Sequence, residues 1–403
     1  MSPADTESSS IRPVVVADSL WLYALFALLA TAGFFYVNIM GAIVDGLVTG
    51  LHFSTTEAGM VGAANIYGAS VGALVAVLIV RHVRWRLALA LLLGVLLVID
   101  LSSLAIHEPV LLTAVRALHG LVGGTAVGVT YSVMARTHSP DRAFGMLLVL
   151  QQGLGGLGLM FLPSLVPVYG TRILFLVLAG LTTLALLGMF AIPRDEVDTV
   201  GEKPVYRALD ARTRWSAALT LLALFLFQAG NMALAAFIIG LGENFQLNRD
   251  FIGQALGWAT WFGAGGAVLV IMMGTRFGRL QPLLLAMAIT LVGIAGFFWS
   301  GNHLVFFLAN LVTAITWSFV VPYLFGMASA LDASGRMASL AGFASKLGLA
   351  SGTAAAGLVL RWGDYQALIG TSLATLALCA VAALIAAHRT EQVSAVGQLA
   401  KVQ

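Results

Sequence analysis

The feature that most constrains this chain is a succession of long apolar segments. Twelve runs of about 20 mostly apolar residues follow one another along the 403 residues, and a helix of that length crosses the hydrocarbon layer of a membrane. Only 10% of the residues are charged, whereas a soluble domain carries about a quarter. The sequence therefore predicts an all-α integral membrane protein. The twelve spans are expected at 20–43, 56–80, 86–106, 109–134, 144–167, 171–192, 215–240, 251–274, 280–300, 304–330, 338–360 and 364–387.

The basic residues between the spans predict how the chain is oriented. If the N-terminus is cytoplasmic, sixteen of the 21 Lys and Arg fall in cytoplasmic connections and tails, and three (Arg172, Arg249 and Arg361) fall on the opposite side. Such an excess marks the cytoplasmic face. We therefore expect a multi-pass protein of the cell inner (plasma) membrane with both termini in the cytoplasm. The two remaining basic residues, Arg116 and Lys346, lie inside predicted spans.

The sequence repeats after its sixth span. Similar residues recur at offsets of 193 to 195 positions: Arg81 with Arg276, Arg84 with Arg279, Asn38 with Asn231, and Gln152 with Lys346. Two parallel six-helix halves are typical of transporters whose binding site lies between the halves near the membrane midplane. The expected domains are a tail (1–19), a six-helix bundle (20–192), a polar linker (193–214), a second bundle (215–387) and a tail (388–403).

Three motifs resemble those of the major facilitator superfamily. The segment Gly274-Thr275-Arg276-Phe277-Gly278-Arg279 is similar to the family's loop motif Gly-x-x-x-Asp-Arg-x-Gly-Arg-Arg, with Thr275 in place of the aspartate. The first copy, at 80–86, lacks both the aspartate and the glycine. Arg116 to Gly124 resembles the helix-4 motif Arg-x-x-x-Gly-x-x-Gly. The segment 152–158, with Pro163, is similar to the glycine-proline motif of the drug:proton antiporters.

The resemblance to this family extends along the whole chain and implies twelve helices in two parallel six-helix bundles. It also implies alternating access, and a proton-coupling role for the helix-4 motif. The loop residues that the resemblance assigns to a cytoplasmic gate are Arg81, Arg84, Arg276, Gly278 and Arg279.

Three ionisable residues near the outer ends of spans 3 and 4 are candidates for proton coupling. Asp100 and Arg116 lie at nearly the same depth, because each is about 10 Å from the outer end of its helix, and an ion pair between them is one possibility. His119 shares a face with Arg116 and has the chemistry of a proton relay. The alternatives are a permanent ion pair that fixes helix packing and a histidine that only hydrogen-bonds a neighbouring helix. We further interpret the Arg116 helix as lining a cavity.

Other polar residues inside the spans are candidates for substrate binding. Lys346 has no acid at a comparable depth in the second half, so it either attracts an anion or extends toward the cytoplasmic interface. Asn38, Asn231, Gln228 and Gln152 either bind substrate or hold neighbouring helices together. In contrast, we expect Asp45 and Glu57, near the outer helix ends, to be solvated.

Several function classes lack residues to support them. We find no metal-ligand spacing, no nucleophile elbow and no nucleotide-binding motif, so we expect neither an enzyme nor a cofactor. The net charge is only +3 and the basic residues lie mostly in short loops, so we expect no nucleic-acid-binding surface. The sequence favours a monomeric secondary transporter in the lipid bilayer that exports a small organic molecule by proton (H+) antiport. The alternatives are an organic-anion symporter or exchanger, in which Lys346 and Arg116 hold a carboxylate, and a receptor-like protein without a transport cycle.

Overall fold

All regular secondary structure in the described part of the chain is helical. A computed structural model describes residues 20–80, 83–134, 137, 140–192, 211–273, 276–331 and 336–402, and these ranges contain no strand. Twelve helices are long and apolar enough to cross a membrane, which confirms the predicted number of spans. The helices are α1 (Leu20–Asn38), α2 (Met40–Gly50), α3 (Thr55–Ile79), α4 (Trp85–Ser103), α5 (Pro109–Met134), α6 (Pro140–Tyr169), α7 (Arg172–Phe190), α8 (Ala211–Ala236), α9 (Ile238–Asn244), α10 (Arg249–Met273), α11 (Leu280–Gly296), η1 (Phe297–Trp299), α12 (His303–Ala330), α13 (Arg336–Trp362) and α14 (Tyr365–Val402).

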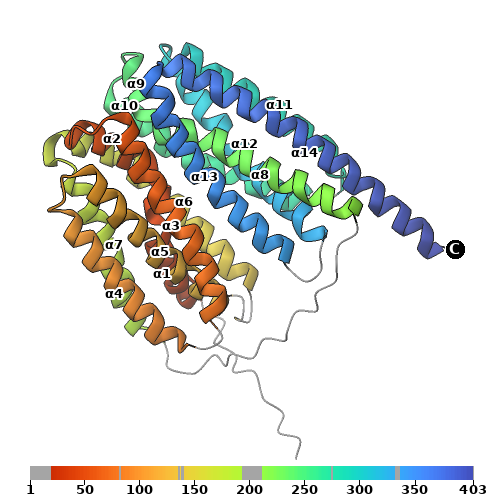
Figure 1. Ribbon diagram of the computed structural model, residues 1–403, viewed down its shortest axis with the longest axis horizontal. Helices are drawn as coiled ribbons and strands as arrows, with labels where there is room; N and C mark the ends of the chain where they lie inside the picture. The colour runs from red at the N-terminus through yellow and green to blue at the C-terminus, as the bar shows by residue number, and fades with distance from the viewer. Residues whose placement is uncertain are drawn as a thin grey trace, which may run out of the picture.

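The helices form two groups of six spans that repeat the same packing. In Figure 1 the first group, α1–α7, runs from red to yellow, and the second, α8–α14, runs from green to blue. In the first group α3 packs against α5 and α4 against α7, and in the second the equivalent α10 packs against α12 and α11 against α14. The predicted fold class, two parallel six-helix bundles, is confirmed.

The predicted limits of the domains fall partly on residues that the structure does not describe. The tail 1–19 and linker residues 193–210 lie outside the described residues. The rest of the predicted linker belongs to α8, which begins at Ala211. The last helix, α14, extends to Val402, through almost all of the predicted C-terminal tail. The domain limits themselves stay a prediction.

The first helix of each bundle is broken at an equivalent point. Ile39 separates α1 from α2 with φ −112° and ψ 25°, and Phe237 separates α8 from α9 with φ −116° and ψ 18°. Discontinuous helices at membrane depth are typical of transporters, because they expose backbone and side-chain polar groups where a cavity lies. Neither break was predicted, since both spans read as continuous apolar runs.

The bundles are joined along two pairs of helices. The first bundle's α3 packs against α13, and its α6 packs against α10. Near the start of α3, the hydroxyl of Thr56 donates to the carbonyl of Gly357 at 3.1 Å. Figure 1 shows the two bundles close together around α2 and α9 and spreading apart toward the side that carries the C-terminus. The joined side is therefore remote from the chain's C-terminal end.

Glycines allow α3 and α5 to approach until their backbones touch. A Cβ atom at Gly120 would overlap the carbonyl of Asn65, and one at Gly68 would overlap the carbonyl of Ala117. Small residues at such crossings are the usual means of helix association in membranes. The glycines of the helix-4 motif therefore have a packing role in this bundle.

We expect Gly120→Ala to destabilise the protein by about 1–3 kcal/mol, because the added methyl must push α5 away from the α3 backbone. Gly94→Ala is the matched control, since a Cβ at Gly94 meets nothing within 4 Å. Thermal unfolding in detergent measures both variants. Equal melting temperatures for the two variants would contradict the close approach.

Candidate functional site

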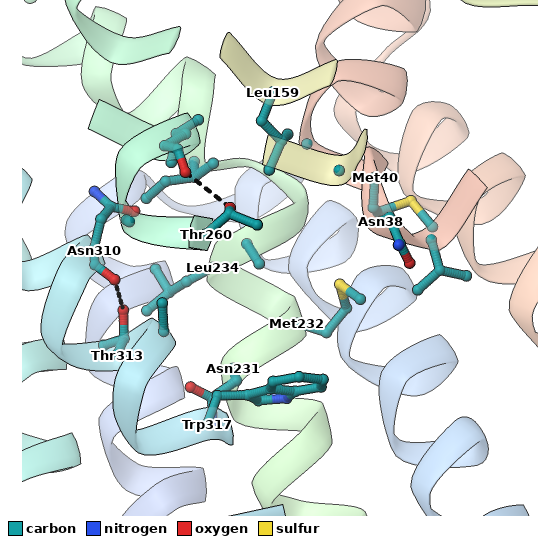
Figure 2. Close-up of a pocket in the computed structure, with 18 of the residues that line it drawn as sticks. Asn38, Met40, Leu159, Asn231, Met232, Leu234, Thr260, Asn310, Thr313 and Trp317 are labelled. Atoms are coloured by element: carbon teal, nitrogen blue, oxygen red, sulfur yellow. Dashed lines mark hydrogen bonds between the residues drawn. The ribbon is translucent and has the colours of Figure 1, made fainter. Parts of the chain in front are cut away.

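A cavity of about 260 Å³ lies between the two bundles, beside the two helix breaks. The first bundle contributes residues of α1, α2 and α6 to its walls, and the second contributes residues of α8 to α13. Figure 2 shows Thr260 and Asn310 on one side, Asn38 and Met40 on the opposite side, and Asn231 with Trp317 below. The broken helices of both repeats thus contribute to the cavity, but the second bundle supplies more of its wall than the first.

Three of the predicted substrate-binding residues line this cavity. They are Asn38, Gln152 and Asn231. Gln152 also crosses to the other bundle, where its Nε2 donates to the carbonyl of Thr260 at 3.4 Å. The sequence analysis missed Asn310, a buried amide on α12 that also lines the cavity. The sequence repeat could have indicated this residue, because Asn310 occupies the position in the second half that corresponds to Arg116, at an offset of 194.

The other two predicted substrate-binding residues lie beside the cavity and are absent from its walls. Gln228 is buried, and it donates to the hydroxyl of Ser345 and accepts from the indole nitrogen of Trp317, both at 2.7 Å. It therefore orients Trp317, whose ring does line the cavity. The Nζ of Lys346 lies 6.0 Å from the ring centroid of Phe34, another lining residue. Within the described residues, no acidic side chain forms an ion pair with Lys346.

The predicted coupling residues form one buried cluster inside the first bundle. Arg116 Nη1 and His119 Nε2 lie 2.9 Å and 3.2 Å from Asp100 Oδ1. Arg116 also donates to the hydroxyl of Ser103 and to the carbonyl of Ile99. Asp100 and Arg116 are completely buried, so the ion pair has no contact with solvent.

Asn65 fixes the protonation state of His119 in this arrangement. Its side-chain nitrogen lies 3.2 Å from the Arg116 carbonyl and 2.8 Å from His119 Nδ1. A carbonyl oxygen only accepts, so the Asn65 atom is the NH2 group and Nδ1 must accept from it. The imidazole proton then resides on Nε2, facing Asp100. The histidine is therefore neutral, and the cluster consists of one carboxylate and one guanidinium with no net charge.

The cluster and the cavity are separate, which corrects the interpretation that the Arg116 helix lines a cavity. None of the described residues in the cavity wall comes from α5. Helix α1 connects the two sites. The ring of Tyr36 lies 5.8 Å from the Arg116 guanidinium carbon, and two residues further along the chain Asn38 lines the cavity.

A second group of charges joins the bundles on their closed side. Arg249, at the start of α10, makes two 2.9 Å contacts with the carboxylate of Asp45 in α2. It also contacts Glu243 in α9 and donates to the carbonyl of Pro163. The expectation of a solvated Asp45 was wrong, because its side chain is 4% exposed. Glu57 is exposed, as expected, and caps α3 through Ser54.

The predicted loop residues lie at the opposite end of the bundles from this ion pair. Arg84 and Arg276 are exposed, and Arg279 precedes α11. Gly278 has φ +68°, a conformation that favours glycine. Arg81 lies outside the described residues. A gating role for these loops stays a prediction.

Comparison with known families identifies this arrangement. The sequence profile described as Major Facilitator Superfamily matches residues 24–220, which cover the first bundle and the start of the second. The match places residues 24–220 in the major facilitator superfamily. No curated protein matches its sequence.

Solved structures show that the likeness in fold extends over both halves of the chain. A mutant of the nucleoside transporter NupG is similar with a TM-score of 0.74 at 12% identity, covering 91% of this chain and 100% of that chain. A bacterial homologue of the human lysosomal transporter Spinster, in an inward-facing and unoccupied conformation, gives 0.69 at 12%, covering 93% and 98%. A mutant peptide transporter POT in complex with sulfate gives 0.70 at 15%, covering 92% and 95%. At these identities the likeness establishes the fold alone.

We expect Asp100→Asn to destabilise the protein by about 3–5 kcal/mol, because it leaves the guanidinium of Arg116 buried without its carboxylate. The double variant Asp100→Asn/Arg116→Met should recover much of that loss, since it removes both charges. Thermal unfolding of the single and double variants measures the difference. A double variant no more stable than Asp100→Asn would show that the pair is not the source of the loss.

Proposed function

We propose that this chain is a secondary active transporter that moves a small organic molecule across the plasma membrane by alternating access. The observation that carries the proposal is a cavity at the two helix breaks together with ion pairs that join the bundles on one side of it. The excess of basic residues supports cytoplasmic termini. With that orientation, the Asp45–Arg249 pair closes the outer side, and the bound molecule exchanges with the cytoplasm.

Two further observations support export in exchange for protons. The helix-4 segment from Arg116 to Gly124 is similar to a family motif linked to proton coupling, and the segment 152–158 is similar to one found in drug:proton antiporters. The structural neighbours named as nucleoside and peptide transporters support a small organic substrate. We therefore propose that this chain transports such a molecule, that it does so outward, and that the coupling ion is the proton.

In the proposed cycle, Asp100 is the proton acceptor. Its Oδ1 holds Arg116 and His119, whereas its Oδ2 is buried with no hydrogen-bond partner among the described residues. A proton on Oδ2 neutralises the carboxylate without displacing either neighbour, and it leaves the Arg116 charge uncompensated. Because that charge is costly to keep buried, protonation favours a conformation in which the guanidinium reaches water. His119, held neutral by Asn65, orients Asp100 in this proposal.

Helix α1 is the proposed link between proton and substrate. The Tyr36 ring contacts Arg116 and His119, with ring centroids of Tyr36 and His119 5.9 Å apart. The same helix ends at Asn38, which lines the cavity, and continues after the break as α2, which carries Asp45. A displacement of α1 therefore reaches the coupling cluster, the cavity and the outer ion pair together.

One observation favours a second candidate, an organic-anion symporter or exchanger. Lys346 carries a positive charge beside the cavity without an acidic partner among the described residues. In this alternative, the ammonium attracts an anion into the space between the bundles. If the protein carries an anion, a Lys346→Gln variant loses transport. If it exports a neutral molecule, the same variant remains active.

Proton coupling is testable in proteoliposomes that contain a pH-sensitive dye and are challenged with neutral, cationic and anionic organic compounds. We expect at least one compound to drive proton movement, and the Asp100→Asn/Arg116→Met variant to carry it without moving protons. The double variant is used because it avoids a buried, unpaired charge. If flux through the unmodified protein does not depend on the proton gradient, proton coupling is contradicted. If no compound is transported, the transport function itself is contradicted.

The outer ion pair predicts a second result. Arg249→Gln should shift the protein toward the outward-open state by about tenfold or more, because the pair stabilises only the closed state. A Met232→Cys reporter in the cavity wall, in a Cys379→Ser background that removes the single native cysteine, reports the state through labelling by an impermeant thiol reagent.

The control for this experiment is Arg361→Gln, which removes another outer cation that stacks on Trp362 within its own bundle. We expect external labelling of the reporter to increase in Arg249→Gln and to be unchanged in Arg361→Gln. The same labelling rate in both variants would rule out a gating role for the Asp45–Arg249 pair.

A further inference from the structure

The polar groups that line the cavity define the chemistry of the molecule that fits it. Among the described residues of the cavity wall there is no Asp, Glu, Lys, Arg or His. The wall is mainly apolar, with the aromatic rings of Phe34, Phe297 and Trp317, and its polar part comes from amides and hydroxyl groups. A charged molecule in this cavity would be desolvated without a counter-charge, which is costly.

The four amides of the wall are all held in the same way. In each one the NH2 group donates to a backbone carbonyl, and because a carbonyl only accepts, this contact fixes which end of the amide is nitrogen. The contacts are Asn38 to Gln151 at 3.2 Å, Gln152 to Thr260 at 3.4 Å, Asn231 to Phe227 at 2.8 Å, and Asn310 to Phe306 at 2.8 Å. The amide oxygens accept no hydrogen bond from the described residues.

Two hydroxyls of the wall and its indole nitrogen also donate within the protein. The hydroxyl of Thr260 donates to the Leu256 carbonyl, and that of Thr313 donates to the Ala309 carbonyl, both at 2.8 Å. The indole N–H of Trp317 donates to Gln228 at 2.7 Å. Each hydroxyl oxygen can still accept. The wall keeps some donors, namely the second N–H of each amide and the hydroxyl of Ser318. Because each amide oxygen has two lone pairs and each hydroxyl oxygen can also accept, the cavity still offers more acceptor than donor sites.

We propose that the cavity binds an uncharged molecule with a flat, largely apolar body that carries at least two N–H or O–H donors. This inference rests on the proposed transport function and names its substrate class. An anion is disfavoured because the acceptor oxygens repel it and no cation lines the wall. A cation is disfavoured because no acidic side chain lines the wall and the ammonium of Lys346 lies 6.0 Å from the ring centroid of the lining residue Phe34.

A series of four compounds on one ring tests the proposal by ligand-observed NMR with the purified full chain. The compounds are 4-hydroxybenzamide (neutral, with donors), 4-methoxy-N,N-dimethylbenzamide (neutral, without donors), 4-hydroxybenzoate (an anion) and 4-hydroxybenzamidine (a cation). We expect 4-hydroxybenzamide to bind about tenfold more tightly than each of the others, because only it satisfies the acceptors without bringing a charge.

Two variants connect this preference to the wall. Asn231→Leu and Asn310→Leu remove an acceptor at nearly constant size, so each should weaken 4-hydroxybenzamide several-fold and leave the donor-free compound unchanged. Gln281→Leu, an exposed amide at the start of α11 and outside the wall, is the control and should change neither. Folding of each variant is checked by its melting temperature.

Several outcomes would overturn the proposal. They are tightest binding of the benzoate or the benzamidine, equal binding of the two neutral compounds, and no binding of any compound at millimolar concentration. The flux assay separates this failure from that of transport. Proton-linked flux of an anion would leave the transporter proposal intact and reject the substrate class. Donor-dependent binding without flux of any compound would support the substrate class and reject the transporter proposal.

Discussion

The first bundle is organised around one buried charge. Arg116 is the largest side chain that is fully buried, and an unpaired guanidinium at that depth would be prohibitively costly. Helix α4 supplies the carboxylate of Asp100, and α3 supplies Asn65, which holds the backbone and imidazole of the same turn of α5. The rings of Tyr36 in α1 and Phe175 in α7 cover the guanidinium. Five helices are thereby fixed relative to a single cation.

The second bundle uses the equivalent positions differently. At the offset of 194, Arg116 corresponds to Asn310, His119 to Thr313, and Asp100 to Ile294, and all three residues of the second bundle line the cavity. The repeat thus places a sealed, ionisable cluster on one side of the molecule and a neutral, acceptor-bearing wall on the other. This division separates a group able to respond to protons from groups able to recognise a molecule.

The sequence predicted the features that follow from periodicity and charge, and missed those that depend on contacts between distant residues. The number of spans and the two-bundle fold follow from apolar length and from the repeat. Depth alone allowed Asp100 and Arg116 to meet, but rotation about each helix axis decides whether they do. The breaks at Ile39 and Phe237 lack a proline or charge as a signal. The pairing of Asp45 with Arg249 joins residues 204 positions apart in different bundles, and no local pattern encodes it.

The two helix breaks connect the cavity to the closed side of the molecule. Each break is followed by a short helix that carries an acid at the same distance, Asp45 six residues after Ile39 and Glu243 six residues after Phe237. Both acids contact Arg249. The repeat therefore brings one carboxylate from each bundle to a single guanidinium, while residues next to the breaks, among them Asn38, Met40 and Ile238, line the cavity. Because α2 and α9 are short and joined to α1 and α8 through non-helical residues, a change in the cavity wall is transmitted to the ion pair over less than two turns of helix. In each half, the cavity wall and the carboxylate that contacts Arg249 thus belong to one structural unit.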